Sequence, residues 1–331
     1  MSDEMSEEPT LEVRDAQPED RDAVFAFCSR TWGDDGDYIP DVWDSWLADP
    51  DGAVLVGIMN GRPVALSRIN MIAPEEAWIE GLRVAPDMRR QGVGRIIVSR
   101  SLVRARELGA FVARMFTGAT NTASQRLFTR YGFTRIAELA WYTGDALPGD
   151  PEEAARVTQP RTAAELDPSI SETTRDTTVG ALPTGARLRT PGPAEFDRLW
   201  AWLEQSNLTP FNGGIEIHHW AGRGVTEPVL REYLAAGNII ELEEWSATQA
   251  LAIVTEDEDH AGLPELEIRY IDGLSDAIGR LALLLRGEAA RRELKRVWLW
   301  LPDLLILRDA MNGAGYLRGD EVPMWAYARE L

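Results

Sequence analysis

Apolar residues recur along the N-terminal half with strand and helix periods in turn, which predicts a series of mixed elements. Short aliphatic runs predict strands at 11–14, 53–59, 64–71, 77–84, 110–116 and 133–142. Amphipathic stretches predict helices at 23–30, 42–48, 94–108 and 122–131. The pair Asn60-Gly61 lies between two of the strand runs and is a strong hairpin signal. The pattern therefore predicts an α/β (α+β) fold.

The order of elements returns after residue 186. Strands are predicted at 186–190, 239–245, 250–254, 266–271 and 297–301. Helices are predicted within 191–203 and at 275–293 and 304–312. Both halves open with a strand and a proline-led helix start with acidic residues, at Pro18 and at Pro193. This agreement indicates an internal duplication.

The segment between the halves has a different composition. Residues 144–185 are rich in Pro, Thr, Asp, Glu and Ala, which is typical of a linker. Residues 1–10 are mostly polar and acidic and are interpreted as a flexible tail. We therefore expect one domain at 11–143 and a second at 186–331, as a chain of 331 residues allows.

Charge narrows the choice of partners. The chain has 34 basic and 54 acidic residues and a net charge of −20. Nucleic acids and anionic membranes require a basic face, so we expect neither as a partner. Lys295 is the only lysine. An acidic, lysine-poor surface is typical of halophilic proteins, whereas GC-rich codon bias would explain the arginines but not the excess of acids.

The charge also gives a first testable prediction. At low ionic strength the like charges repel one another, and salt screens this repulsion. We expect the melting temperature to rise steeply between dilute buffer and molar potassium chloride, measured by calorimetry. A flat dependence would favour codon bias as the origin of the lysine scarcity.

Several kinds of chemistry are excluded or disfavoured. The single cysteine, Cys28, cannot form an intrachain disulfide or a cysteine-built metal cluster. Adjacent His218 and His219 point in different directions on a regular helix or strand, so we expect a structural role for them and no metal. The acidic N-terminus lacks a signal-peptide pattern, and the longest aliphatic run, 281–285, is too short to span a bilayer. We therefore expect a cytoplasmic protein.

The most informative segment joins the strand at 77–84 to the helix at 94–108. Gly92 and Gly94 lie at this junction, and without a Cβ they let backbone N–H groups approach a ligand closely. The helix N-terminus adds partial positive charge. Three arginine side chains complete a candidate cradle for a pyrophosphate: Arg89, Arg90 and Arg95.

The order Arg89-x-x-Gly92-x-Gly94 resembles the acetyl-CoA pyrophosphate loop of the GNAT acetyltransferase family, Gln/Arg-x-x-Gly-x-Gly/Ala. The run 82–86, Leu-Arg-Val-Ala-Pro, resembles the family's preceding strand. The run 121–133, with Asn121, Ser124 and Gly132-Phe133, resembles the family's second cofactor motif. The resemblance covers residues 11 to about 143. It implies the acyl-CoA N-acyltransferase fold, a mixed, mostly antiparallel central sheet with flanking helices.

The resemblance implies an N-acetyltransferase that uses acetyl-CoA as co-substrate, without a metal, and a small-molecule or peptide amine as acceptor. Backbone N–H groups around 82–84 would hold the acetyl carbonyl and the oxyanion. Glu80 would accept the proton of the amine, directly or through water; the alternatives are a solvated strand residue or an arginine partner. The cofactor-binding residues implied are Leu82, Arg83, Val84, Arg89, Arg90, Gln91, Gly92, Val93, Gly94, Arg95, Asn121 and Ser124.

One departure from the family concerns the general acid. The family's tyrosine, four residues before the glycine of the Gly-Phe pair, is replaced here by Phe128, which cannot donate a proton. Tyr131 is the nearest candidate in sequence, but it faces another way on a helix. Protonation by water, or by no protein group, is the alternative.

The second half lacks the glycine pair. Its corresponding loop, 271–280, has Asp272 and Asp276 where the pyrophosphate would lie, which indicates a degenerate GNAT-like domain. Trp298 and Trp300 fall on one face of the predicted strand, for packing or as a substrate platform. The acids within 241–244 are candidates to line a cleft for a cationic amine.

Three functions remain open. The first is an N-acetyltransferase whose N-terminal domain is active on a primary amine. The second is a non-catalytic acyl-CoA sensor or interaction scaffold. The third is a tandem enzyme that resembles mycothiol-synthase-type double GNAT proteins.

Overall fold

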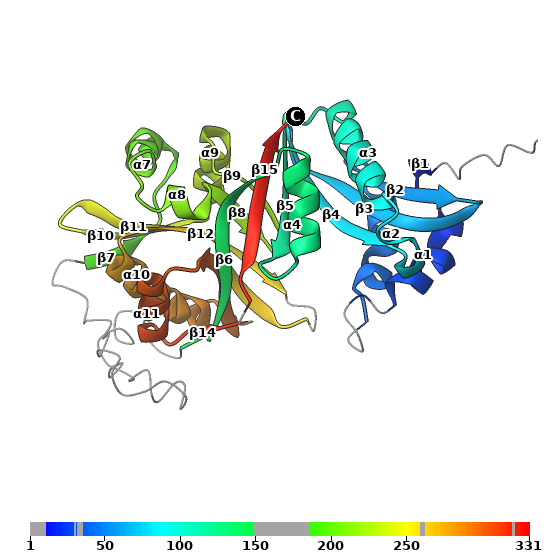
Figure 1. The fold of residues 1–331 in the computed structure, drawn as a ribbon. Helices are drawn as coiled ribbons and strands as arrows, with labels where there is room; N and C mark the ends of the chain where they lie inside the picture. Colours follow the sequence, from blue (N-terminus) through cyan, green and yellow to red (C-terminus); the bar gives the residue numbers. More distant parts are fainter. Residues whose placement is uncertain (1–10, 30, 32–35, 148–185, 259–261, 320–321) are drawn as a thin grey trace, which may run out of the picture. The chain divides into compact units, whose positions relative to one another are not determined.

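The computed structural model describes residues 11–29, 31, 36–147, 186–258, 262–319 and 322–331 (Figure 1). The tail predicted at 1–10 and most of the predicted linker lie outside the described residues. The chain divides into two compact units. The first contains the chain up to Thr117, Asn121–Thr134 and Tyr327–Leu331; the second contains Gly118–Thr120 and Arg135–Ala326.

The first unit is built on a mixed sheet. Its strands are β1 (Glu12–Asp15), β2 (Gly52–Met59), β3 (Arg62–Ala73), β4 (Glu76–Val84) and β5 (Val112–Gly118). The first four pair antiparallel in chain order, and β5 pairs parallel with β4. The turn between β2 and β3 has positive φ at Asn60 (52°) and Gly61 (74°), so the predicted hairpin is confirmed.

Helices cover both faces of this sheet. They are α1 (Arg21–Cys28), α2 (Ile39–Ala48), α3 (Val93–Glu107) and α4 (Thr122–Arg130), with short 3₁₀ turns η1 (Pro18–Asp20) and η3 (Pro86–Met88). Figure 1 shows α3 on one face of β2–β4 and α1 and α2 on the other. Neighbouring residues of β2 alternate between the two cores. Ala53 and Leu55 join the α3 side, and Val54 and Val56 join the α1–α2 side.

A β-bulge interrupts β4 next to the candidate catalytic residue. The register with β3 shifts between the pairs Arg83–Leu66 and Glu80–Arg68. Gly81, inside this shift, has φ +64°, a conformation that favours glycine. A Cβ built on Gly81 would lie 2.7 Å from Cη2 of Trp46. Bulges of this kind re-aim a strand beside a functional site.

We expect Gly81→Ala to destabilise the protein by about 1–3 kcal/mol, because it adds left-handed strain and a collision with Trp46. The matched control is Gly61→Ala, which has φ +74° but open space around its Cβ. Urea unfolding of both variants separates strain from collision. Equal shifts of the two midpoints would show that Trp46 moves aside without cost.

The second unit repeats the pairing order of the first. Its strands are β6 (Thr134–Asp145), β7 (Ala186–Arg189), β8 (Ile215–His218), β9 (Ala221–Gly224), β10 (Ile239–Glu244), β11 (Ala247–Glu258), β12 (Pro264–Gly273), β13 (Arg296–Pro302) and β14 (Leu317–Arg318). The last strand, β15 (Met324–Glu330), is divided between the units, with Met324–Ala326 in the second and the rest in the first. The order β7–β10–β11–β12 is antiparallel, and β13 pairs parallel with β12. The hairpin β8–β9 is a separate small sheet. The predicted mixed, mostly antiparallel fold is therefore confirmed in both units.

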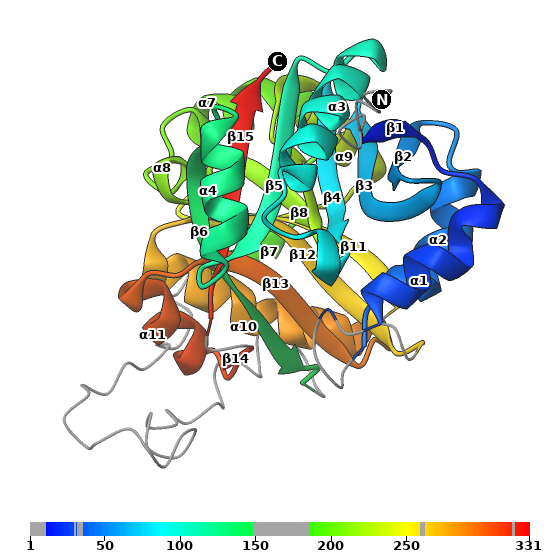
Figure 2. The same ribbon diagram turned by 45° about the vertical axis from the view of Figure 1, so that its right-hand side comes forward.

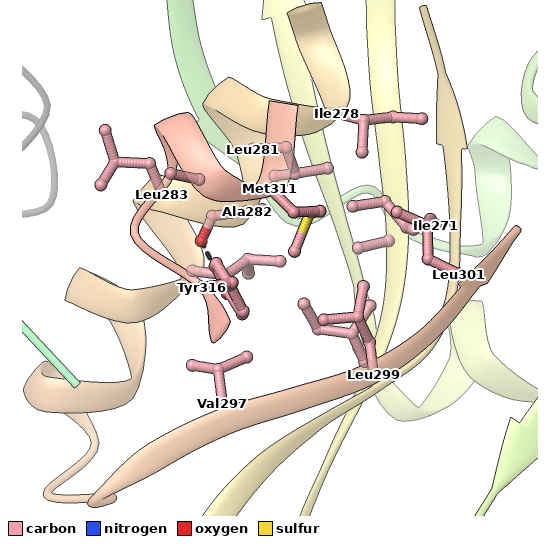
Figure 3. Close-up of a cluster of buried hydrophobic side chains, with 14 of the residues drawn as sticks. Ile271, Ile278, Leu281, Ala282, Leu283, Val297, Leu299, Leu301, Met311 and Tyr316 are labelled. Atoms are coloured by element: carbon pink, nitrogen blue, oxygen red, sulfur yellow. Dashed lines mark hydrogen bonds between the residues drawn. The ribbon is translucent and has the colours of Figure 1, made fainter. Parts of the chain in front are cut away.

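Helices also cover the second sheet. They are α7 (Phe196–Leu203), α8 (Thr209–Asn212), α9 (Glu227–Ala236), α10 (Ser275–Arg291) and α11 (Leu305–Gly313), with the 3₁₀ turn η4 (Pro193–Glu195). Figure 2 shows α10 and α11 side by side, in orange and brown. Figure 3 shows their apolar side chains packed against Val297, Leu299 and Leu301 of β13. Tyr316 is fully buried there, and its hydroxyl donates to the carbonyl of Ala282 at 2.9 Å.

The unit boundaries differ from the predicted domains at 11–143 and 186–331. From Arg135 onward β6 belongs to the second unit, where it pairs antiparallel with β13. The last residues, Tyr327–Leu331, belong to the first unit. There the N–H of Leu331 donates to the carbonyl of Phe111 at 2.8 Å. Backbone pairing, and not sequence order, thus decides where each terminal strand of a half belongs.

The expectation that His218 and His219 point in different directions is wrong. His218 ends β8, and His219 has φ +51° in the turn to β9, so the strand alternation stops between them. The two rings lie 4.2 Å apart. The four-residue strands β8 and β9 are too short to show a period in the sequence, so the hairpin was not predicted.

Within the described parts of the chain, no helix combines the length and the apolar character needed to cross a membrane.

Candidate functional site

The loop from β4 to α3 has the geometry of an anion cradle. Gly92 caps α3 with φ +87°, and Arg90 has φ +65°. The first turn of α3 contains no acidic residue, so its N-terminal N–H groups and partial positive charge face a ligand without competition from a carboxylate. The polar side chains of the loop are exposed: Arg89, Arg90, Gln91 and Arg95. The residues present therefore fit a pyrophosphate.

The two parallel strands beside this loop separate. The β4–β5 ladder covers only Glu76–Val112, Ala77–Ala113 and Trp78–Arg114. β4 then continues to Val84 and β5 to Gly118, so both strands run on beyond their shared ladder. The bulge at Gly81 lies in the separated part of β4. Leu82, Arg83 and Val84 follow it, where the sequence predicts the backbone N–H donors.

The second cofactor motif forms the start of α4. Asn121 is the N-cap of this helix, and its Oδ1 accepts a hydrogen bond from the N–H of Ser124 at 3.1 Å. Phe128 is buried and packs edge-to-face against Phe133, with ring centroids 5.1 Å apart. This packing explains why phenylalanine is stable at that position.

Tyr131 lies at the end of α4 and contacts the cradle. Its hydroxyl donates to the carbonyl oxygen of Arg95 at 2.7 Å, which ties the end of α4 to the first turn of α3. Its proton therefore has a backbone partner. A role of Tyr131 as general acid stays a prediction, and the contact with Arg95 gives it a positioning role.

Glu80 lies on β4 in an ionic cluster. Arg68 donates to Glu80 at 3.1 Å and to Asp49 at 2.6 Å. The Glu80 side chain is 18% exposed. Burial raises the pKa of the Glu80 carboxyl above its usual range; Arg68 opposes this rise, and Asp49 adds to it. A carboxyl with a raised pKa is a better proton acceptor than an ordinary one.

A second ion pair lies on the same side of the unit. Arg83 donates to both oxygens of Asp37, at 2.7 and 3.1 Å. Its guanidinium lies 5.3 Å from the ring centre of Tyr38, and that ring packs edge-to-face on Trp46. The side chain of Arg83, which the sequence assigns to the cofactor, is therefore committed to Asp37.

Sequence reasoning missed these neighbours of Glu80. The acids and aromatic rings among them lie just before α2, within it and just after it. The available signal was a run of acids and aromatics at 37–49, DYIPDVWDSWLAD. Asp37, Asp49 and Glu80 face only two guanidiniums in these ion pairs. This excess of carboxylates over guanidiniums favours a cationic amine as the acceptor.

Cys28 is not a candidate nucleophile. It is fully buried, and burial raises the pKa of its thiol to about 12. The thiolate form is therefore scarce at neutral pH.

In the second unit, the acid before the corresponding loop is held by neighbouring residues of that unit. Asp272 is buried and accepts hydrogen bonds from Ser206 and Tyr270 at 2.6 Å and from the N–H of Gly273 at 2.7 Å. Burial raises its pKa. The acids within 241–244, which were expected to line a cleft for a cationic amine, are held in ion pairs, so that expectation is wrong. Glu241, Glu243 and Glu244 are all buried and paired with arginines.

Trp298 and Trp300 both contact the β8–β9 hairpin, as a shared face predicts. The Trp298 ring stacks on His219 with centroids 6.1 Å apart, and Nε1 of Trp300 donates to the carbonyl of His219 at 2.9 Å. Trp300 also packs edge-to-face on Trp220, 5.0 Å away. These contacts support the packing role.

Residues 17–133 match the model of the acetyltransferase (GNAT) family. This matched segment is similar to the GNAT family. It contains the loop, α4 and all of Glu80's neighbours described above. The chain is similar to probable N-acetyltransferase 16 of Homo sapiens, with 36% identity over 107 residues, 30% of this chain and 29% of the relative. It is also similar to histidine N-acetyltransferase of Oreochromis niloticus, with 30% identity over 129 residues, 37% of this chain and 38% of the relative.

The chain thus covers well under half of these two relatives. The fold likeness extends further than the matched segment 17–133. A putative acetyltransferase from Thermoplasma acidophilum matches 97% of this chain and 100% of its own, with a TM-score of 0.53 and 18% identity. At this identity the likeness shows the fold alone.

Proposed function

We propose that the first unit transfers the acetyl group of acetyl-CoA to the primary amine of a small molecule, by direct attack within a ternary complex. The observation that carries the proposal is the separation of β4 and β5 beside a glycine-capped helix start. Two strands whose ladder ends early and an anion cradle at one end of β4 suit a long, pyrophosphate-bearing thioester.

Each part of the site has its own task in this proposal. The loop Arg89–Arg95 and the N-terminus of α3 bind the pyrophosphate. Backbone N–H groups of Leu82, Arg83 and Val84 orient the acetyl carbonyl and stabilise the charge on its oxygen. Asn121 and Ser124 hold the start of α4, and Tyr131 holds α4 to α3. When bound, acetyl-CoA supplies the activated acetyl group.

Glu80 moves the proton. It accepts one proton from the ammonium of the acceptor, directly or through water, and so generates the neutral amine that attacks. When the carbon–sulfur bond breaks, the attacking nitrogen loses its second proton, and water carries this proton to the departing thiolate, because Phe128 has none to donate and the hydroxyl of Tyr131 already donates to Arg95.

Small amines are the acceptors we favour. One relative is named for histidine, which carries a primary amine, and the excess of carboxylates around Glu80 attracts an ammonium group. We further infer that the second unit binds no coenzyme, because Asp272 lies just before the corresponding loop and is held by neighbouring residues of that unit.

Release of free CoA is the decisive measurement. We expect acetyl-CoA turnover with a panel of primary amines that includes histidine, with the acetylated product identified by mass. Phe128 favours a non-catalytic acyl-CoA sensor as the second candidate. Saturable binding of acetyl-CoA without CoA release from any amine of the panel would support the sensor and contradict the enzyme.

A further inference from the structure

The second unit contains a cluster of metal-ligating side chains that the acetyl-transfer proposal does not use. His218 and His219 lie at the turn of the β8–β9 hairpin, Asp257 lies near the end of β11, and Glu267 lies on β12. Candidate ligand atoms of His218, His219 and Glu267 all lie within 4.8 Å of one another. Three separate elements therefore bring nitrogen and oxygen donors to one point.

The spacing of these donors suits a divalent transition metal. Nδ1 of His218 lies 2.7 Å from Oε2 of Glu267 and 3.7 Å from Oδ2 of Asp257. Nε2 of His219 lies 3.1 Å from the same Asp257 oxygen. Ligand atoms around a tetrahedral zinc ion, each at about 2.0–2.1 Å from it, lie roughly 3.3 Å apart. The three separations given above lie on both sides of this value, and the 4.8 Å limit for His218, His219 and Glu267 allows the three atoms to close around one ion.

Glu267 is held as a rigid anchor for such an ion. Its side chain is 1% exposed, and its Oε1 accepts a hydrogen bond from the N–H of His219 at 2.7 Å. The same residue, His219, has a left-handed backbone, φ +51°, an uncommon conformation for a non-glycine residue. Thr255 donates to Oε2 at 3.2 Å. These contacts resemble the outer shell that orients metal-binding carboxylates.

The contacts of His218 cannot all be satisfied by one proton. Its Nδ1 lies 2.7 Å from a carboxylate oxygen of Glu267 and 2.9 Å from Nη2 of Arg269, a donor. If Nδ1 carries a proton, this proton and the N–H of Arg269 are two donors that face each other. If Nδ1 carries no proton, its lone pair lies against the lone pairs of the Glu267 carboxylate. A cation shared by Nδ1 and Oε2 removes the second conflict, because both atoms are then ligands.

The remaining charges permit a cation, although Arg269 opposes it. Two carboxylates, Asp257 and Glu267, face one guanidinium in the cluster. Arg269 has other partners that can retain it, since it donates to Tyr233 at 3.0 Å and to Thr255 at 2.9 Å. The histidine side chains are 43% and 40% exposed, so an ion can reach them from solvent.

We propose that His218, His219 and Glu267 bind one divalent transition metal ion beside Asp257, with zinc as the best match to two imidazoles and a carboxylate. The ion would fasten the β8–β9 hairpin to β12. This proposal departs from the sequence expectation of no metal.

The test is zinc titration of the full chain after treatment with a chelator. We expect one zinc per chain by calorimetry, a rise in melting temperature on addition of zinc, and a shell of nitrogen and oxygen at about 2.0–2.1 Å by X-ray absorption. His218→Gln and His219→Asn should each weaken zinc binding roughly 100-fold or more, since even outer-shell changes cost 10–100-fold. Asparagine tolerates the positive φ of position 219.

The matched control is Glu256→Gln. Glu256 lies on β11 beside Asp257, is 55% exposed and pairs with Arg292, outside the cluster. This variant should bind zinc as the parent does. Absence of stoichiometric zinc binding by the parent, or equal affinity in the parent and in folded His218→Gln and His219→Asn proteins, would overturn the proposal. Both readouts are independent of acetyl transfer.

Discussion

Replacement of Glu80 by glutamine is expected to lower kcat/KM for the amine acceptor by roughly 10²–10⁴, because the variant has no carboxylate to accept the ammonium proton. The glutamine oxygen still accepts a hydrogen bond from Arg68, so the local ion cluster keeps its shape. Part of the loss should return at high pH, where free amine is abundant. Steady-state CoA release across pH measures both effects.

The pH profile of the parent should carry the signature of Glu80. The group accepts a proton only when ionised, so activity falls as pH drops through its pKa, which burial and Asp49 raise above the usual range of a carboxyl. Asp49→Asn is the informative comparison. It removes a like charge and leaves Arg68 to Glu80, so the acid limb should move to lower pH while activity persists. Full activity of Glu80→Gln at every pH would assign Glu80 to structure.

Replacement of Gly92 by aspartate is expected to weaken acetyl-CoA binding at least tenfold, about 1.4 kcal/mol. The new carboxylate would lie at the N-terminus of α3, where a pyrophosphate needs positive potential. A Cβ at this position would lie 3.2 Å from Nη2 of Arg95, so the carboxylate would also compete for a cradle arginine. Calorimetry with acetyl-CoA gives the dissociation constant directly.

Gly92→Asn separates charge from bulk. Asparagine is nearly the same size as aspartate and tolerates the φ of +87° better than most residues. We expect the asparagine variant to retain much more affinity than the aspartate variant. Equal losses would mean that the side chain blocks the cradle sterically, and unchanged affinity in a folded Gly92→Asp protein would place the coenzyme elsewhere.

The parts of the site that follow local rules could be predicted from the sequence. The cradle depends on glycines at a strand-to-helix junction, and the Asn60-Gly61 hairpin depends on two left-handed residues. In both cases the residues that matter are close together in the sequence, so the pattern can be recognised without the fold. Asp37 and Asp49 could not be placed next to Arg83 and Arg68, because those ion pairs join α2 and its flanking loop to distant strands. The rings of His218 and His219 lie together where His219 has a positive φ, and a histidine in the sequence gives no sign of this backbone conformation.

The placement of Tyr327–Leu331 in the first unit has a consequence for how the chain is made. The Thr134 hydroxyl donates to the Ala328 carbonyl, 194 positions later. Arg329 likewise donates to the carbonyl of Tyr131. In a nascent chain that has released only its first half from the ribosome, Tyr131 and Thr134 therefore lack these partners, and β6 has no β13 to pair with. We expect the first unit to gain these contacts only after Ala328 and Arg329 have been made.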